Sequence, residues 1–322
     1  MGAIVFAGSR LSWYGDVIAQ RTRLGRTWVG VALMASITSL PELVTGISSV
    51  AIFDLPNIAA GDVFGSCMFN LLLIALIDVL VEETPLSTRV QQGQVLTAAF
   101  GVLMLGTAGA GIIAAAKIPG LGWISLSSLV LLGMYFVAMR VVFMYEKKRA
   151  AQRIEQAVEA GPYDAISTSY AVRMYTLNAL IVVAAAIWLP RLGAQIADIT
   201  GLGRTFVGSV FVAVSTSLPE LVVSLAALRI GAVDLVLGNL LGSNLFNIGI
   251  LAVDDMFYRK GSLLEAVDKT HMIAVCTAMA MTAVAIIGIT YRPAKKRHRL
   301  AWDSAAIAGL YAAASVLLYE LR

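Results

Sequence analysis

Ten long apolar stretches, separated by short polar segments, make up most of this 322-residue chain. Most of them reach about 20 residues, the length at which an α-helix crosses the hydrocarbon core of a bilayer. The strands of a membrane barrel would alternate apolar and polar residues, and these stretches do not. Because 59% of the residues are hydrophobic and only 14% are charged, we exclude a cytosolic enzyme and a disordered chain. The sequence predicts an all-α polytopic membrane protein.

The ten predicted spans fall into two groups of five, on either side of a polar stretch. We expect a first five-helix repeat over residues 1–145, a cytoplasmic linker over 146–173 and a second five-helix repeat over 174–322. The predicted spans are 1–19, 28–53, 58–81, 95–116, 123–145, 177–199, 206–228, 232–257, 272–289 and 301–318. The first span is unusual, because Arg10 and Asp16 interrupt it. Either the chain begins late or its first helix is short.

The loops on the two sides of the predicted spans differ in basic residues. The loops after the odd-numbered spans carry sixteen Lys and Arg residues, and the segments on the other side carry seven. Cytoplasmic loops of membrane proteins are enriched in Lys and Arg, so both termini are expected outside the cytoplasm. The formal charge of +4 is explained by this topology, and no nucleic-acid partner is expected.

Two segments of the chain repeat one another. Residues 25–50 read GRTWVGVALMASITSLPELVTGISSV and residues 203–228 read GRTFVGSVFVAVSTSLPELVVSLAAL, with identity at 13 of 26 positions. A second motif follows each copy, GDVFGSCMFN over 61–70 and GNLLGSNLFN over 238–247. The copies lie five spans apart, an odd number, so they enter the membrane from opposite faces. Inverted repeats are typical of secondary transporters, which bind ions near the bilayer midplane.

Each copy places a glutamate near the middle of an apolar span. Glu42 and Glu220 occupy the same motif position, and neither span has a Lys or Arg near its middle. An acidic residue at a helix centre costs about 2.5–3.5 kcal/mol on insertion scales, so a partner from solution is expected. Proline after each motif leucine leaves a carbonyl, near Ile37 and Ser215, without its helical donor. Carboxylate, hydroxyl and carbonyl oxygens suit hard cations such as Ca²⁺ and Na⁺, not zinc or copper.

Hydroxyl and amide side chains stand at helical spacing around these glutamates. Residues three or four positions apart share one face of a helix. The motif glycines, by contrast, indicate close helix packing. We predict one cation site between the four motif segments. Its predicted ligands are Thr38, Ser39, Glu42, Ser66, Asn70, Thr216, Ser217, Glu220, Ser243 and Asn247.

These paired motifs resemble the alpha repeats of the cation/calcium antiporter superfamily, and the chain is similar to its prokaryotic sodium/calcium exchangers. The resemblance covers most of the chain. It implies a ten-helix fold in which helices two, three, seven and eight form the ion site and helices one and six slide past them. It implies that the ten residues above match the family's ligand positions, joined by carbonyls near Ala35 and Ala213. Some members carry Asp where this chain has Asn247, so the site here has two motif acids.

The resemblance also implies a cellular setting. It places the chain in a prokaryotic plasma membrane, with inorganic cations as substrates and the lipid bilayer as surroundings. It implies transported Ca²⁺ and Na⁺ or H⁺, and no cofactor. The sequence leaves the oligomeric state open.

Two of the differences between the copies of the second motif change a functional group. Asp62 stands where the second copy has Asn239, and Cys67 stands where it has Asn244. Asp62 shares the helix face of the motif serine and asparagine, so we include it as a further candidate carboxylate of the ion pathway. The alternative is that Asp62 caps the start of its own helix. Cys67 lies one position off the ligand face and is expected to pack in the core.

Two further acids also follow the repeat. Asp78 and Asp255 each lie eight residues after the motif asparagine. We expect both at the ends of their spans, where interfacial water accounts for their charge. Two histidines and two cysteines are too few for a haem, a zinc centre or a disulfide framework.

The function that this pattern favours is an antiporter that moves Ca²⁺ against Na⁺ by alternating access. A Ca²⁺/H⁺ exchanger of the same fold is the closest alternative, because two glutamates can bind protons; the hydroxyl ligands favour Na⁺. An intramembrane aspartyl protease would need two facing Asp residues, whereas the duplicated acid is Glu. A channel remains a third class, although paired carboxylates between inverted repeats favour a closed site.

Overall fold

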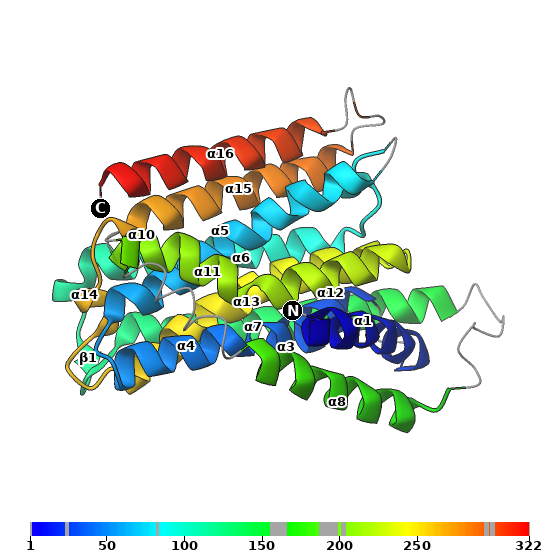
Figure 1. Ribbon diagram of the computed structural model, residues 1–322, viewed down its shortest axis with the longest axis horizontal. Coiled ribbons are helices and arrows are strands. Elements are labelled where there is room, and N and C mark those ends of the chain that lie inside the picture. The colour runs from blue at the N-terminus through cyan, green and yellow to red at the C-terminus, as the bar shows by residue number, and fades with distance from the viewer. Residues whose placement is uncertain are drawn as a thin grey trace.

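The computed structural model is a single elongated bundle of helices that run side by side (Figure 1). It describes residues 2–22, 26–81, 84–154, 166–186, 199–200, 204–292, 296 and 300–321. Within these residues six helices are long and apolar enough to cross a membrane, and two bent helix pairs meet the same test together. The only strands of the described segments are the two-residue β1 (Gly120–Leu121) and β2 (Ile124–Ser125). The expected all-α polytopic membrane architecture is confirmed.

The first half of the chain runs from α1 to α7. Its α1 is one continuous helix through Arg10 and Asp16, and Asp16 accepts a 2.9 Å hydrogen bond from Arg26. The elements are α1 (Gly2–Thr22), α2 (Arg26–Trp28), η1 (Val29–Met34), α3 (Ala35–Thr38), α4 (Leu40–Ala51), α5 (Pro56–Leu80), η2 (Leu86–Thr88), α6 (Gly93–Ala114), η3 (Ala115–Lys117) and α7 (Leu126–Ile154).

The second half runs from α8 to α16. Its elements are α8 (Thr168–Ala186), α10 (Arg204–Phe206), η4 (Val207–Val212), α11 (Ala213–Thr216), α12 (Leu218–Arg229), α13 (Val233–Phe257), α14 (Leu263–Ala266), α15 (His271–Tyr291) and α16 (Trp302–Glu320). Neither α1 nor α8 is among the helices that meet the membrane-span test, so the ten-span count stays a prediction. Helix α7 continues to Ile154, inside the predicted linker, whose residues 155–165 lie outside the described part.

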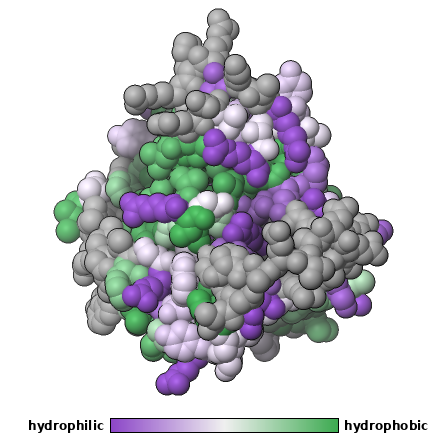
Figure 2. Space-filling model, turned by 90° about the vertical axis from the view of Figure 1, so that its right-hand side faces the viewer, coloured by the Kyte–Doolittle hydropathy of each residue, from purple (hydrophilic) through white to green (hydrophobic). Residues whose placement is uncertain are grey.

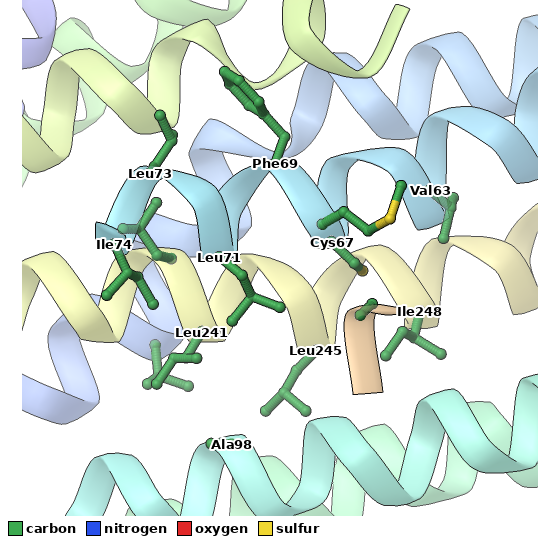
Figure 3. Packing of buried hydrophobic residues seen from close by; sticks show 14 of the residues in the cluster. Val63, Cys67, Phe69, Leu71, Leu73, Ile74, Ala98, Leu241, Leu245 and Ile248 are labelled. Atoms are coloured by element: carbon green, nitrogen blue, oxygen red, sulfur yellow. The ribbon is translucent and has the colours of Figure 1, made fainter. Parts of the chain in front are cut away.

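Helices α5 and α13 form the centre of the bundle. They contact each other, and nearly every residue from Ala59 to Asp78 is buried. Figure 3 shows this packing, with Leu71 of α5 facing Leu241 and Leu245 of α13. Cys67 lies in the same apolar core with no exposed surface, as expected. Helices α6 and α15 flank this centre, whereas α1 and α8 pack together at its edge (Figure 1).

Both TSLPE motifs break their helices at the serine. Ser39 leaves helical geometry (φ −89°, ψ 9°), and α4 begins after it with Pro41 in its first turn. Ser217 has nearly the same geometry (φ −85°, ψ 11°) ahead of α12. The helix axes bend by 42° and 45° at these breaks. Proline explains the break, because it lacks the N–H that would continue the preceding turn.

Motif glycines let the two repeats approach closely. A Cβ atom on Gly30 would lie 2.9 Å from the Cα of Gly238, and one on Gly61 would lie 3.0 Å from the Cα of Gly208. Gly30 and Gly208 lie in the π-helical segments η1 and η4, which occupy matching places in the two repeats. Each central helix therefore packs against the broken span of the other repeat, and the close packing expected of the glycines is confirmed.

The aspartates at the ends of the central helices hold loops rather than face water. Asp78 is 1% exposed and accepts hydrogen bonds from the Leu86 amide (2.7 Å) and from Lys296 (3.0 Å). Asp255 is fully buried and accepts hydrogen bonds from the Leu263 amide (2.6 Å) and the Ser125 amide (2.7 Å). The expectation of interfacial solvation is wrong, because each following loop folds back and its amides replace water.

The end of α5, which carries Asp78, lies at the right-hand end of Figure 1, with the end of α7 and the start of α8. Figure 2 looks onto this end and shows hydrophilic residues spread between apolar ones. The loop of Asp255 and the β1–β2 hairpin lie at the opposite end (Figure 1). The basic residues in the last part of α7, such as Lys147 and Lys148, therefore belong to the same bundle end as Asp78.

Candidate cation-binding site

The two motif glutamates lie just after the helix breaks, at the centre of the bundle. Glu42 is the third residue of α4 and Glu220 the third residue of α12. Neither side chain has any exposed surface. Both carboxylates lie in the first turn of a helix, where the free amides and the helix dipole favour negative charge. The break thus gives each buried acid a favourable backbone environment without neutralising it.

Each glutamate is bound by the serine of the opposite repeat. Ser39 Oγ donates to Glu220 Oε1 at 3.0 Å, and Ser217 Oγ donates to Glu42 Oε1 at 3.1 Å. The sequence predicted these serines as neighbours of the glutamate in their own repeat. The helix breaks fall between them, so the prediction of one continuous face through Thr38, Ser39 and Glu42 is wrong. The contact that forms instead crosses between the repeats.

The motif threonines make a second set of contacts across the repeats. Thr38 Oγ1 lies 3.4 Å from Ser243 Oγ, which in turn donates to Glu220 Oε1 at 3.3 Å. Thr216 Oγ1 lies 3.4 Å from Ser66 Oγ. All of these hydroxyls are fully buried. The structure therefore brings Ser243 to Glu220 and brings Ser66 to the threonine of the opposite repeat.

Asp62 is also directed across the repeats. It is the seventh residue of α5, and its Oδ1 accepts a 2.8 Å hydrogen bond from Thr216 Oγ1. The alternative interpretation, that Asp62 caps the start of α5, is wrong because the helix begins at Pro56. At the matching position of the second repeat, Asn239 Oδ1 lies 3.2 Å from Thr38 Oγ1.

Asparagines continue the polar cluster along α5 and α13. Asn70 Nδ2 donates to Asn244 Oδ1 at 3.1 Å, and Asn244 Nδ2 donates to the Cys67 carbonyl at 3.2 Å. The side chain of Asn247 makes no hydrogen bond among the described residues. Asn239 and Asn244 were not in the predicted ligand set. The repeat itself carried the signal, since they align with Asp62 and Cys67, where the first copy has a different functional group.

Oxygen atoms without hydrogen-bond donors remain at the centre of this cluster. They are fully buried, and no described basic side chain forms an ion pair with the acids. Buried polar atoms are normally hydrogen-bonded, and an unpaired buried charge is costly. These atoms are Glu42 Oε2, Asp62 Oδ2, Asn70 Oδ1, Glu220 Oε2 and Asn247 Oδ1.

This oxygen set fits a hard cation. Carboxylate, amide and hydroxyl oxygens are the usual ligands of Ca²⁺. The set includes no sulfur or imidazole ligand of the kind that zinc or copper prefers. No group of three His, Cys, Asp or Glu side chains converges closely enough in the described part of the chain to bind a metal without other ligands. The neutral hydroxyl and amide oxygens are therefore needed to complete a coordination shell.

Comparison with protein families points to transporters. The model of the family described as "Sodium/calcium exchanger protein" matches residues 1–144 and 171–320. An uncharacterised membrane protein of Methanocaldococcus jannaschii is 28% identical over 258 residues, which cover 79% of this chain and 78% of that protein. The sodium/calcium exchanger MaX1 of Methanosarcina acetivorans is 32% identical over 126 residues, which cover 39% of this chain and 34% of that protein.

The fold is also found among solved structures. A structure of the sodium-calcium exchanger NCX_Mj soaked with Na⁺ and Ca²⁺ matches 98% of this chain and 94% of its own, with a TM-score of 0.70 and 21% identity. A second structure of the same exchanger, soaked without either ion, matches with a TM-score of 0.69 and 23% identity. At this level of identity the likeness shows the fold.

Proposed function

The chain belongs to the sodium/calcium exchanger protein family, and we propose that it exchanges Ca²⁺ for Na⁺ at the site around Glu42 and Glu220. The observation that carries this proposal is the crossed pair of hydrogen bonds. One oxygen of each glutamate accepts a hydrogen bond from the other repeat, and its second oxygen has no partner in the described structure. A cation bound between the free oxygens would contact both repeats at once.

The charge of the site supports exchange rather than one-way leakage. Two carboxylates carry a formal charge of −2, which one Ca²⁺ or two Na⁺ balance. With no cation bound, both charges would be buried without compensation, and that state is strongly disfavoured. The site therefore switches from one membrane face to the other most readily when it holds Ca²⁺ or Na⁺, as coupled exchange requires.

The helices that would move lie beside the site. Ser12 of α1 donates to the Val223 carbonyl of α12 at 2.7 Å, and α1 packs on α8 along the edge of the bundle. We assign alternating access to sliding of α1 and α8 against the centre, which α5 and α13 form. In this arrangement residues 1–145 and 174–322 act as the two inverted repeats. The proposed setting is a prokaryotic plasma membrane, with both termini outside.

Uptake of radioactive Ca²⁺ into proteoliposomes of the purified protein tests the exchange. Vesicles loaded with Na⁺ are compared with Na⁺-free vesicles under a pH gradient. We expect uptake that depends on internal Na⁺ and is lost in Glu42→Gln and in Glu220→Gln. Glu265→Gln, a change to an exposed residue of α14, is the matched control and retains uptake.

The alternative coupling ion is the proton. The free carboxylate oxygens that would hold Na⁺ could each bind a proton instead. Uptake driven only by the pH gradient would mean that the proposed site is correct and that the coupling ion is H⁺ instead of Na⁺. Na⁺-driven uptake that survives both glutamine substitutions would refute the proposed site.

A further inference from the structure

Asp254 of α13 is a buried acid that the site above does not use. It has no exposed surface, and neither carboxylate oxygen has a hydrogen-bond partner among the described residues. No described Lys, Arg or His forms an ion pair with it. Its neighbour Asp255 differs, since two loop amides bind it. Binding to loop amides therefore explains the buried carboxylate of Asp255 and leaves that of Asp254 unexplained.

The structure leaves room for this carboxylate at one glycine. A Cβ atom on Gly46 of α4 would overlap both carboxylate oxygens of Asp254. The matching position of the second repeat carries Ser224, whose hydroxyl accepts a 3.1 Å hydrogen bond from Asn239 Nδ2. The second repeat thus has a serine side chain at this position. The first repeat has no side chain there, and the Asp254 carboxylate lies against the glycine instead.

Asp254 belongs to a line of acids that leads to the central site. In the second repeat Asn239 contacts Ser224, and their equivalents in the first repeat are Asp62 and Gly46. Because the Asp254 carboxylate lies against Gly46, the repeat places Asp62 beside Asp254. The side chains of both aspartates and of the two motif glutamates are fully buried, and all but Asp254 contact a hydroxyl. Asp62 Oδ2, like both oxygens of Asp254, has no hydrogen-bond partner in the described part of the chain.

This line of acids is present on one side of the site only. Asp62 and Asp254 lie toward the bundle end at which α5 begins and α13 finishes. Their repeat equivalents, toward the opposite end, are Asn239 and Ile77. The inverted repeat therefore gives a nearly symmetric central site. The path from one bundle end to this site carries two carboxylates, and the path from the other end carries neutral residues at the matching positions.

We propose that Asp254, together with Asp62 at the edge of the central cluster, forms a second site for a hard cation, which captures ions on the way between one membrane face and Glu42. The proposal rests on the cation exchange proposed above. Two carboxylates with free oxygens favour a divalent ion, and negative charge along a narrow approach raises the local cation concentration. Under the predicted topology this is the outer face. Exchange then has a lower KM for Ca²⁺ from that face than from the other.

The transport test compares the two faces. Ca²⁺ uptake is measured in right-side-out and inside-out vesicles with Asp254→Asn, Asp254→Glu and the control Asp54→Asn, an exposed acid at the same bundle end. We expect Asp254→Asn to raise the KM for Ca²⁺ about tenfold from the outer face alone, in line with charge focusing, and Asp254→Glu to retain most of the affinity. An equal change from both faces, or none, would overturn the proposal.

A binding test keeps this proposal separate from the central site. Calorimetric Ca²⁺ titration of the detergent-solubilised Glu42→Gln/Glu220→Gln variant is expected to show one weak site. That site should disappear when Asp254→Asn is added, at unchanged melting temperature. Absence of the weak site in the double variant would refute the second site whether or not the protein exchanges Na⁺. A wild-type protein that transports nothing but retains the weak site would refute the exchange instead.

Discussion

The serine hydroxyls at the two helix breaks connect each glutamate with the opposite repeat. Ser39 and Ser217 make equivalent bonds of 3.0 and 3.1 Å. Their neighbours Ser36 and Ser215 bond instead to carbonyls four residues earlier in their own helices, both at 2.7 Å. Serines of the same motif thus fall into two groups. Some bind a glutamate of the opposite repeat, and the others bind a carbonyl of their own helix.

We predict that Ser39→Ala and Ser217→Ala weaken Ca²⁺ binding to a similar extent. A hydrogen bond to a charged group contributes about 1.5–3 kcal/mol, so the KM for Ca²⁺ should rise about tenfold or more in each variant. The concentration dependence of uptake measures this. Ser36→Ala and Ser215→Ala are the matched controls, with a near-normal KM. Equal effects in all four variants would show that the crossed bonds have no special role.

The loop-holding aspartates should matter for stability. Asp255→Asn replaces a carboxylate that accepts two amide bonds and should lower the free energy of unfolding by about 1–3 kcal/mol. The melting temperature in detergent reports the loss. Asp54→Asn removes only an exposed pair with Lys260 (2.6 Å) and should leave the melting temperature nearly unchanged, because water screens such pairs. A larger drop for Asp54→Asn than for Asp255→Asn would contradict this account.

At the scale of elements, the broken spans and the central helices depend on contact between backbones. The π-helical turns η1 and η4 place their glycines against α13 and α5. Turns of this kind are often found at functional sites. No side chain could fill these contacts without separating the repeats, and the oxygens of the site would separate with them.

We predict that Gly65→Ala impairs both folding and transport. Its Cβ would lie 2.5 Å from the Ser209 Cα, so η4 would have to move away from α5. Overpacking of this kind costs about 1–3 kcal/mol. The melting temperature and Ca²⁺ uptake should both fall. Gly101→Ala in α6 is the control, because a Cβ there meets nothing within 4 Å, and it should keep both. Normal uptake in Gly65→Ala would mean that the helices can separate without harm.

The sequence repeat predicted much of this arrangement. Glu42 and Glu220 were found because two buried acids at one motif position are costly, and the prolines marked the breaks. The crossed partners could not be predicted, since residues 181 and 175 positions apart show their contacts only after folding. Asp78 and Asp255 were misplaced for a similar reason, because the amides that bind them belong to loops. Asp254 was overlooked beside Asp255, which had the clearer repeat partner.

At the scale of the whole molecule, the distribution of charge sets the orientation. The end of α7, the start of α8 and the end of α15 lie at one end of the bundle (Figure 1), and Lys296 binds Asp78 at the end of α5. We predict this end to be cytoplasmic. Alkaline phosphatase fused after residue 322 should then be active, whereas the same enzyme inserted after Arg149 should be inactive. The reverse pattern would invert the assignment of the outer face.

The crossed glycine contacts carry a consequence for ancestry. Gly30 touches Gly238, and Gly61 touches Gly208, so neither half of the chain can complete these contacts alone. A precursor with a single copy could have built them only by meeting a second copy inserted upside down. Such a precursor would have entered the membrane in both orientations with equal frequency. Once gene duplication joined the copies, each was free to diverge, and the unequal pair Asp62 and Asn239 records a specialisation that a symmetric dimer could not hold.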